Sequence, residues 1–111
     1  MREPLLPAGA VDEALRRSAA SDQHELAGWS VVDGQLVSTF VCPGFRAALA
    51  FVNAVGDLAE EADHHPDIDI RWNRVTLRLV THDSGGLTRL DLDLARAVRV
   101  LADATLPGPG S

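Results

Sequence analysis

Hydrophobic and polar positions follow two different periods along the chain, and the changes of period divide it into helices and strands. Apolar residues recur at helical spacing over residues 11–20, 45–63 and 88–104. Over residues 29–42 and 68–79, apolar and polar residues alternate instead, as in strands with one buried face. The predicted order is α-β-β-α-β-β-α. This order indicates an α+β fold, a four-stranded antiparallel sheet with three helices packed on one face.

Two-residue turns should join the strands into hairpins. Asp33-Gly34 is the dipeptide that most favours such a turn, and Asn73-Arg74 is expected to form the second one, with Asn73 at positive φ. Trp29 and Trp72 alternate with polar neighbours, so we expect both in the core. A tryptophan ring near the candidate histidines would also offer a stacking surface.

Cap and proline signals mark where the helices begin and end. Thr88 and Asp91 have the spacing of a capping box, which predicts the start of the last helix. Pro66 disfavours the helical conformation for the residue before it, so the middle helix should end near Asp63.

Length and composition limit the domain organisation. A chain of 111 residues with 46% hydrophobic content can build one core and not two, so we expect a single domain over residues 1–105. The Pro/Gly-rich residues 106–111 are expected to be a disordered tail. Cys42 has no second cysteine to pair with and closes an apolar strand, which indicates a buried structural thiol in a reducing compartment.

Charge narrows the classes of partner. The ten cationic residues are all arginines, they do not cluster along the sequence, and the net charge is -6. Because nucleic-acid binding needs a cationic face, we expect no nucleic-acid partner. The N-terminal apolar run is only Leu5-Leu6 before Pro7, too short for a signal peptide or a spanning helix. We therefore expect no membrane partner and a cytoplasmic location.

Three of the four histidines should meet where the middle helix gives way to the second hairpin. Glu60 and His64 share a face of the helix's last turn if it stays helical that far, and His64 and His65 then leave the helix in different directions. Strand parity places His82 on the polar face, and counting from the turn brings it opposite residues 63–65. Imidazole, with an unperturbed pKa of about 6.5, exchanges a proton near neutral pH. Such a cluster suits a reaction in which one proton leaves and another arrives, as in elimination of water.

Other interpretations of these residues compete with the chemical one. A zinc site is disfavoured because adjacent histidines diverge and the paired spacings of common zinc sites are absent, so we predict no metal. A His-His-Pro run after a helix is more often a solvated cap than a catalytic site. Glu60 alone is typical of an exposed helix residue, and capping already accounts for Asp91.

The chain nevertheless resembles the pterin-4a-carbinolamine dehydratase family over roughly residues 11 to 104. The matching motifs are Glu60-x-x-x-His64-His65-Pro66, Trp72-Asn73-Arg74-Val75, Thr81-His82-Asp83, Gly86-Leu87-Thr88 leading to Asp91, and Gly28-Trp29 upstream. Pro43-Gly44 stands where the family often has a charged pair, a departure that touches packing and not the site.

The resemblance implies the same α+β fold and a dehydratase that converts 4a-hydroxytetrahydrobiopterin to quinonoid dihydropterin plus water, without cofactor, in tetrahydrobiopterin recycling. By position it implies that His64 and His82 form an acid/base pair and that His65 both binds the pterin and shares in catalysis. It implies that Glu60 is a carboxylate that orients a histidine or the pterin. The supporting pterin-binding positions that it implies are Asp63, Trp29 and Asp91.

The resemblance also leaves a non-catalytic alternative open. Relatives of the family include a dimerisation partner of a transcription factor and Rubisco assembly factors, which have binding roles. Retention of Glu60 and all three histidines favours the enzyme. Family members assemble as dimers or tetramers, so a homodimer or homotetramer is expected.

Overall fold

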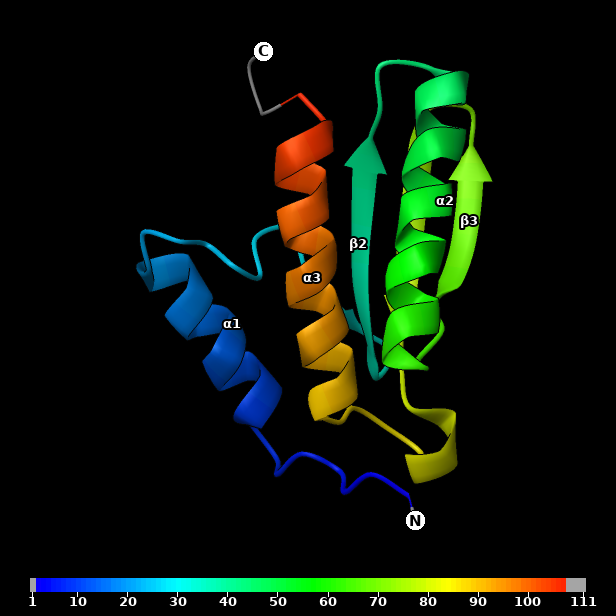
Figure 1. The fold of residues 1–111 in the computed structure, drawn as a ribbon. Coiled ribbons are helices and arrows are strands. Elements are labelled where there is room, and N and C mark those ends of the chain that lie inside the picture. The colour runs from blue at the N-terminus through cyan, green and yellow to red at the C-terminus, as the bar shows by residue number, and fades with distance from the viewer. Residues whose placement is uncertain (1, 108–111) are drawn as a thin grey trace.

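The computed structural model describes residues 2–107, and the order α-β-β-α-β-β-α predicted from the sequence is confirmed over them (Figure 1). The elements are α1 (Ala10–Ala20), β1 (Ser30–Val32), β2 (Gln35–Val41), α2 (Phe45–Ala62), β3 (Asp67–Arg71), β4 (Arg74–Leu79), the short 3-10 helix η1 (His82–Ser84) and α3 (Arg89–Thr105). Of the tail expected to be disordered, residues 108–111 lie outside the described residues.

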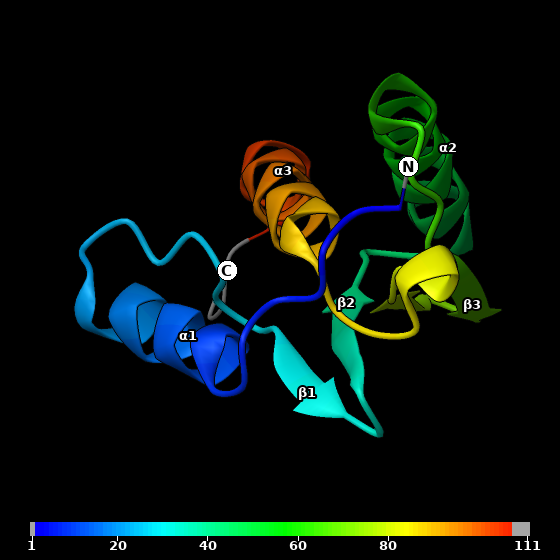
Figure 2. The ribbon, with the colours of Figure 1, turned by 90° about the horizontal axis from the view of Figure 1, so that it is seen from below.

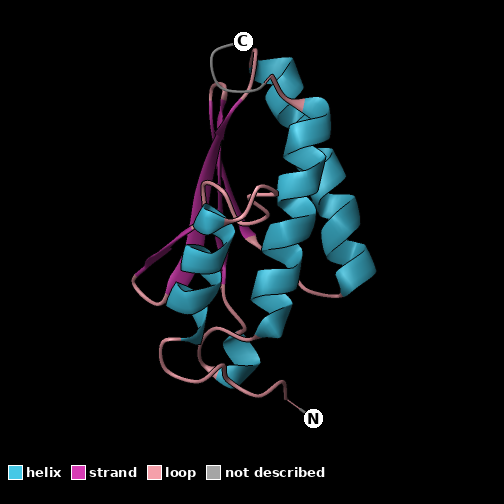
Figure 3. Ribbon diagram, turned by 90° about the vertical axis from the view of Figure 1, so that its left-hand side faces the viewer, coloured by secondary structure: helices cyan, strands magenta, loops and turns pink. Residues whose placement is uncertain are grey.

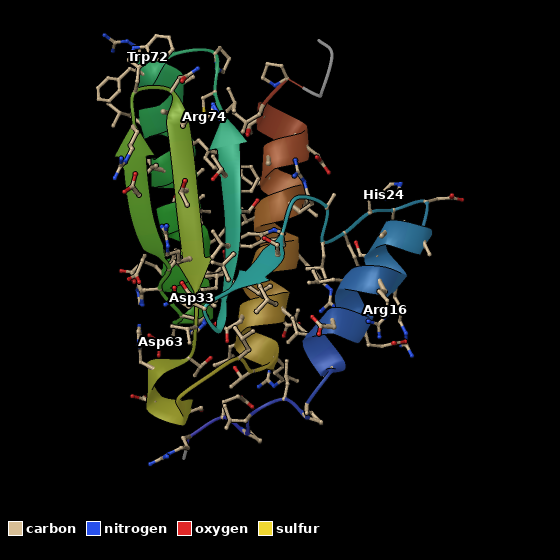
Figure 4. The ribbon with its side chains drawn as sticks, turned by 180° about the vertical axis from the view of Figure 1, so that it is seen from behind. Arg16, His24, Asp33, Asp63, Trp72 and Arg74 are labelled. Atoms are coloured by element: carbon tan, nitrogen blue, oxygen red, sulfur yellow. The ribbon has the colours of Figure 1, made fainter. Side chains whose placement is uncertain are left out.

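The four strands form one antiparallel sheet in the order β1-β2-β4-β3. The two hairpins therefore meet through β2 and β4, and the long helix α2 connects them. Figure 3 shows the helices on one side of the sheet, and Figure 4 shows its opposite face uncovered by any helix. In the view of Figure 2, α2 and α3 lie over the sheet while α1 lies beside α3, towards β1.

The core lies between the sheet and the pair α2 and α3. Alternate residues of the central strands point into it, and they meet apolar side chains that recur at helical spacing on both helices. Its largest fully buried apolar side chains are those of Leu36, Val75, Leu77 and Leu79 of the sheet, Val55 of α2 and Val98 of α3. The central strands are thus packed closely beneath the helices, which fixes where the chain segments that follow them begin.

The first hairpin turn forms as expected. Asp33 and Gly34 both have positive φ, at 51° and 76°, which is the backbone that a two-residue turn with right-handed strand twist requires.

The expected turn at Asn73-Arg74 is wrong by one residue. Arg71 pairs with Arg74, so the turn consists of Trp72 and Asn73, and Trp72 takes the positive φ of 53°. Asn73 is held by the end of β2: its carbonyl accepts from the Cys42 amide at 2.8 Å and its side-chain amide donates to the Cys42 carbonyl at 3.1 Å. These long-range bonds, and not the local preference of asparagine, decide where the turn lies.

The two tryptophans therefore differ in their surroundings. Trp29 is buried at 5% exposure and packs edge-on against Phe40, as expected. Trp72 is 67% exposed at the hairpin turn, so its expected place in the core is wrong. Cys42 is buried, as expected, and burial raises the pKa of its thiol.

The expectation that the arginines do not cluster is wrong on the open face of the sheet. Arg71, Arg74 and Arg78 line one shallow hollow there, around Thr39 and Thr76. Strand pairing brings them together: Arg71 lies directly across from Arg74, and Arg78 is on the same face of β4. The absence of a nucleic-acid partner stays a prediction. Within residues 2–107, no helix has the length and apolar character needed to cross a membrane.

Candidate active site

The end of α2 determines where the adjacent histidines point. Asp63 adopts a left-handed backbone with φ of 49°. Its amide donates to the Glu60 carbonyl at 3.2 Å, and the next amide, of His64, donates to the Ala59 carbonyl at 3.1 Å. This pair of bonds is the Schellman arrangement, which satisfies the last carbonyls of a helix and reverses the chain. Helix α2 therefore stops at Ala62, close to the predicted end.

The reversal separates the two imidazoles. His64 turns inward and is 9% exposed, whereas His65 turns outward and its side chain is 58% exposed. The two histidines thus leave the helix in different directions, as expected, but the helix does not extend to His64, so Glu60 and His64 do not share its last turn. Glu60 instead contacts His65, with 2.6 Å between its Oε2 and the ring Nε2.

His82 comes from a second segment of the chain, just after the central strand β4. The expected strand register for His82 is wrong, because β4 ends at Leu79 and His82 begins the 3-10 helix η1. That turn is closed by the Thr81 carbonyl, which accepts from the amides of Ser84 and Gly85 at 3.0 Å. Thr81 and Gly86 also form an isolated bridge. The imidazole of His82 is thus presented, exposed, at the tip of a compact loop.

The predicted convergence of the three histidines is present. His64, His65 and His82 line one hollow of about 270 Å³, together with Asp63, Val80, Thr81, Asp83 and Leu90. Figure 4 shows Asp63 at this end of the sheet and Trp72 at the other. Enclosed small-molecule sites usually measure roughly 300–1,000 Å³. A ligand of this hollow would therefore keep part of its surface in water.

A buried carboxylate ties the histidine segments together. Asp91, in the first turn of α3, is 0% exposed. Its Oδ1 lies 2.6 Å from Nε2 of His64, and its Oδ2 accepts from the hydroxyl of Thr81, the residue before His82, at 2.9 Å. The same Oδ2 accepts from the Thr88 amide at 2.9 Å, which completes the predicted capping box. One side chain therefore caps α3, orients His64 and anchors the base of the His82 loop.

The direction of each hydrogen bond in this network follows from donor counting. A carboxylate only accepts, so the Thr81 hydroxyl gives its single proton to Asp91. The Thr88 hydroxyl, 2.7 Å from that of Thr81, must then donate to it, and it accepts in turn from the Leu90 amide at 3.2 Å. By the same argument Nε2 of His64 carries a proton towards Asp91. The other ring nitrogen, Nδ1, is then left to bind or exchange a proton.

Three site residues predicted from the sequence do not line the hollow, namely Glu60, Trp29 and Asp91, and Glu60 reaches it only through His65. Trp29 does not line the hollow and packs in the core. Asp91 does not line it either, and reaches it only through His64.

The sequence indicated Thr88 only as a helix cap and Thr81 only as part of a matching motif, and it did not predict that their hydroxyls complete the Asp91 network. Two features of the sequence could have indicated Thr81: it is adjacent to His82, and the capping residue Asp91 follows ten residues later.

No three ligand-type side chains (His, Cys, Asp or Glu) gather as a metal ion would require within the part of the chain that the structure describes. The chemistry that this geometry can perform is proton transfer between imidazoles and a bound molecule.

The sequence of this chain is similar to one protein family and to several known proteins. The model of the family "Pterin 4 alpha carbinolamine dehydratase" matches residues 11–101. A protein of Thermomicrobium roseum, provisionally named a pterin-4-alpha-carbinolamine dehydratase, is 54% identical over 75% of this chain and 89% of its own length. A Herpetosiphon aurantiacus protein with the same provisional name is 43% identical over 91% of this chain and 98% of its own.

Solved structures have the same fold. A crystal structure titled transcriptional coactivator/pterin dehydratase from Brucella melitensis superposes with a TM-score of 0.76 at 33% identity, over 88% of this chain and 98% of that one. A pterin dehydratase-like protein described as a RuBisCO assembly factor superposes with a TM-score of 0.58 over 71% of this chain and 94% of that one. At 24% identity, this second likeness concerns the fold alone. The family match and the identities together establish that the chain belongs to the pterin 4 alpha carbinolamine dehydratase family.

Proposed function

We propose that this protein dehydrates 4a-hydroxytetrahydrobiopterin to quinonoid dihydropterin and thereby serves tetrahydrobiopterin recycling. The observation that carries the proposal is one hollow lined by three histidines, one of which is bonded to a fully buried aspartate. Membership of the family supports the reaction class. The hollow supports the choice of residues, because it gathers imidazoles from two segments of the chain.

The reaction needs two proton transfers at neighbouring atoms. A base takes the proton from N5 of the pterin. The electron pair left on N5 forms the N5=C4a double bond, and the C4a–O bond breaks. An acid protonates the departing hydroxyl, which leaves as water. His64 and His82 are the proposed acid/base pair, since they line the same hollow and come from two different segments of the chain. No cofactor takes part in this scheme.

Asp91 supports the pair as a positioning residue. It is too buried to touch the pterin, but its carboxylate holds the His64 ring in one orientation. Its negative charge also stabilises the imidazolium form of His64 when that ring carries the transferred proton. Through Thr81 it fixes the start of the His82 loop, so one carboxylate sets the separation of both imidazoles.

His65 and Glu60 are proposed to contact the pterin at the rim of the hollow. Both side chains are exposed, and the 2.6 Å contact between them restrains the His65 ring. Glu60 would thus orient His65, and Asp63 offers a carboxylate on the same rim. We propose that the protein acts in the cytoplasm as a homodimer or homotetramer.

Carbinolamine breakdown followed by ultraviolet absorbance tests this function. Wild type should accelerate the reaction over the uncatalysed rate, and His64→Ala and His82→Ala should each lose most of the acceleration. General acid/base catalysis typically contributes about 10²–10⁴-fold, which sets the size of the loss. His24→Ala is the matched control, because His24 is exposed in the connector after α1 and should leave the rate unchanged. No acceleration by wild type would favour a binding role instead.

A further inference from the structure

The N-terminal segment that precedes α1 runs alongside the loop that carries His82. Figures 1 and 2 show this segment passing from α1 to the short helix η1 at one end of the molecule. We call residues 3–7 the N-terminal strap. It lies before residues 11–101, the part of the chain that the family model matches. Its contacts are therefore a property of this chain that the family match does not describe.

The strap binds the His82 loop at several points. The Ser84 hydroxyl donates to the Glu3 carbonyl, and Ser84 is itself buried at 9% exposure. The Leu6 amide donates to the Leu87 carbonyl at 3.0 Å. A methyl group of Leu5 lies 3.0 Å from the position that a Cβ on Gly86 would take, so the Leu5 side chain covers this glycine closely. These contacts hold both the η1 turn and the chain that leaves it.

Glu3 also connects the loop to α3. Its carboxylate lies 3.0 Å from the guanidinium of Arg89, the first residue of α3, and its side chain is only 20% exposed. Two residues further along α3, Asp91 holds His64. Glu3 therefore joins the element that presents His82 to the helix turn that orients His64.

The loop needs such support because it is short. A single 3-10 turn has poor hydrogen-bond geometry and is marginal by itself. Apart from the strap, its bonds run mainly to one acceptor, the Thr81 carbonyl. Loops with few internal bonds open locally at low cost. A small displacement of a catalytic group is enough to slow a reaction substantially.

We propose that the N-terminal strap positions His82 for proton transfer, with Glu3 as the positioning residue; this rests on the proposed function. Glu3 acts through the loop and does not touch the substrate. His64 is held separately by Asp91, so loss of the strap should affect the contribution of His82 and leave that of His64 in place.

Deletion of residues 2–6 tests the proposal in two independent ways. Hydrogen exchange at the amides of Gly85 and Gly86 should accelerate, on the order of fivefold for each hydrogen bond between strap and loop that the deletion removes. The amide of Leu77 in β4 should stay protected. Ser84→Ala removes one strap contact without shortening the chain and should accelerate the same amides less. Glu13→Gln breaks two ion pairs on α1 that are remote from the loop and serves as the control. Unchanged hydrogen exchange at these amides in both the deletion variant and Ser84→Ala would overturn the proposal that the strap holds the loop.

The kinetic test is a double-mutant cycle between the deletion and His82→Ala. In the wild-type background the deletion should lower kcat about tenfold. In the His82→Ala background it should lower kcat no further, because its effect runs through His82. If the deletion lowered kcat equally in the wild-type and His82→Ala backgrounds, the strap would have a merely structural role and the proposal would be overturned. Faster exchange at Gly85 with no dehydratase activity in wild type would support the strap as a clamp on the loop and refute the proposed function.

Discussion

Replacing Asp91 with asparagine separates its roles as a cap and as a partner of His64. Both carboxylate oxygens accept hydrogen bonds, whereas the amide has one acceptor and one donor group. Its oxygen is best placed towards the Thr88 amide and the Thr81 hydroxyl, which only donate to it. The amide nitrogen then faces Nε2 of His64, which must become an acceptor and move its proton to Nδ1.

The size of the effect follows from the three bonds that change. Hydrogen bonds to a charged group contribute about 1.5–3 kcal/mol each, and neutral ones about 0.5–1.5 kcal/mol. Asp91→Asn should therefore lower the free energy of unfolding by about 3 kcal/mol. A domain is typically stable by roughly 5–15 kcal/mol, so the variant should stay folded. Because Nδ1 of His64 then carries a proton where it had a free electron pair, the ring is in the wrong tautomer to accept a proton, and kcat should fall by about 10²–10⁴-fold.

Three measurements check this prediction. Urea denaturation gives the stability, ultraviolet-monitored carbinolamine breakdown gives kcat, and long-range proton–nitrogen NMR correlation of the His64 ring reports its tautomer. Asp93→Asn is the matched control, since Asp93 is on the same helix but 59% exposed and paired only with arginines. Exposed pairs contribute about 0–1 kcal/mol, so this control should change little. An Asp91→Asn enzyme with unchanged kcat and an unchanged tautomer would refute the positioning role.

Three smaller predictions concern single residues around the site and in the core. Asp63→Gly should raise the free energy of unfolding, measured by urea denaturation, by about 0.5 kcal/mol. The left-handed backbone costs an L-residue roughly 1–2 kcal/mol, and the conformational entropy that glycine loses on folding offsets about 1 kcal/mol of the relief. A lower denaturation midpoint would contradict this. Glu60→Gln should change stability by less than about 0.5 kcal/mol, since its contact with His65 is exposed. The same variant should nevertheless raise KM, and an unchanged KM would remove Glu60 from the site. Cys42 should react with iodoacetamide on the order of 100-fold more slowly than free cysteine near pH 8, because burial shields it and raises its pKa; rapid modification of the folded protein would show that the thiol is accessible.

The fold was predictable from the sequence where local signals and tertiary packing agree. Asp33-Gly34 favours a tight turn by itself, and the apolar spacing of α2 coincides with the face that meets the sheet. Thr88 and Asp91 form a capping box whose members are close in sequence. The second hairpin shows the limit. Asn73 prefers the positive φ that Trp72 adopts, and only the bonds from Asn73 to Cys42, far away in sequence, decide between them.

The candidate site divides in the same way. That the histidines meet could be predicted, because hairpin pairing returns the chain to its starting point. Which histidine contacts which carboxylate could not, because the reversal at Asp63 turns His64 inward and His65 towards Glu60. Asp91 was the harder case. Capping accounts fully for its spacing, and its contact with His64 joins residues 27 apart that no local pattern connects.

A crystal structure of the protein with a bound dihydropterin tests the central claim most directly. The proposed function predicts that the pterin occupies the hollow with its N5 and C4a edge between His64 and His82, within hydrogen-bonding distance of both rings. His65 should contact the ring system from the rim, and Asp91 should keep its bond to His64. A pterin bound elsewhere, or one in this hollow with N5 and C4a turned away from both imidazoles, would contradict the proposed histidine acid/base pair.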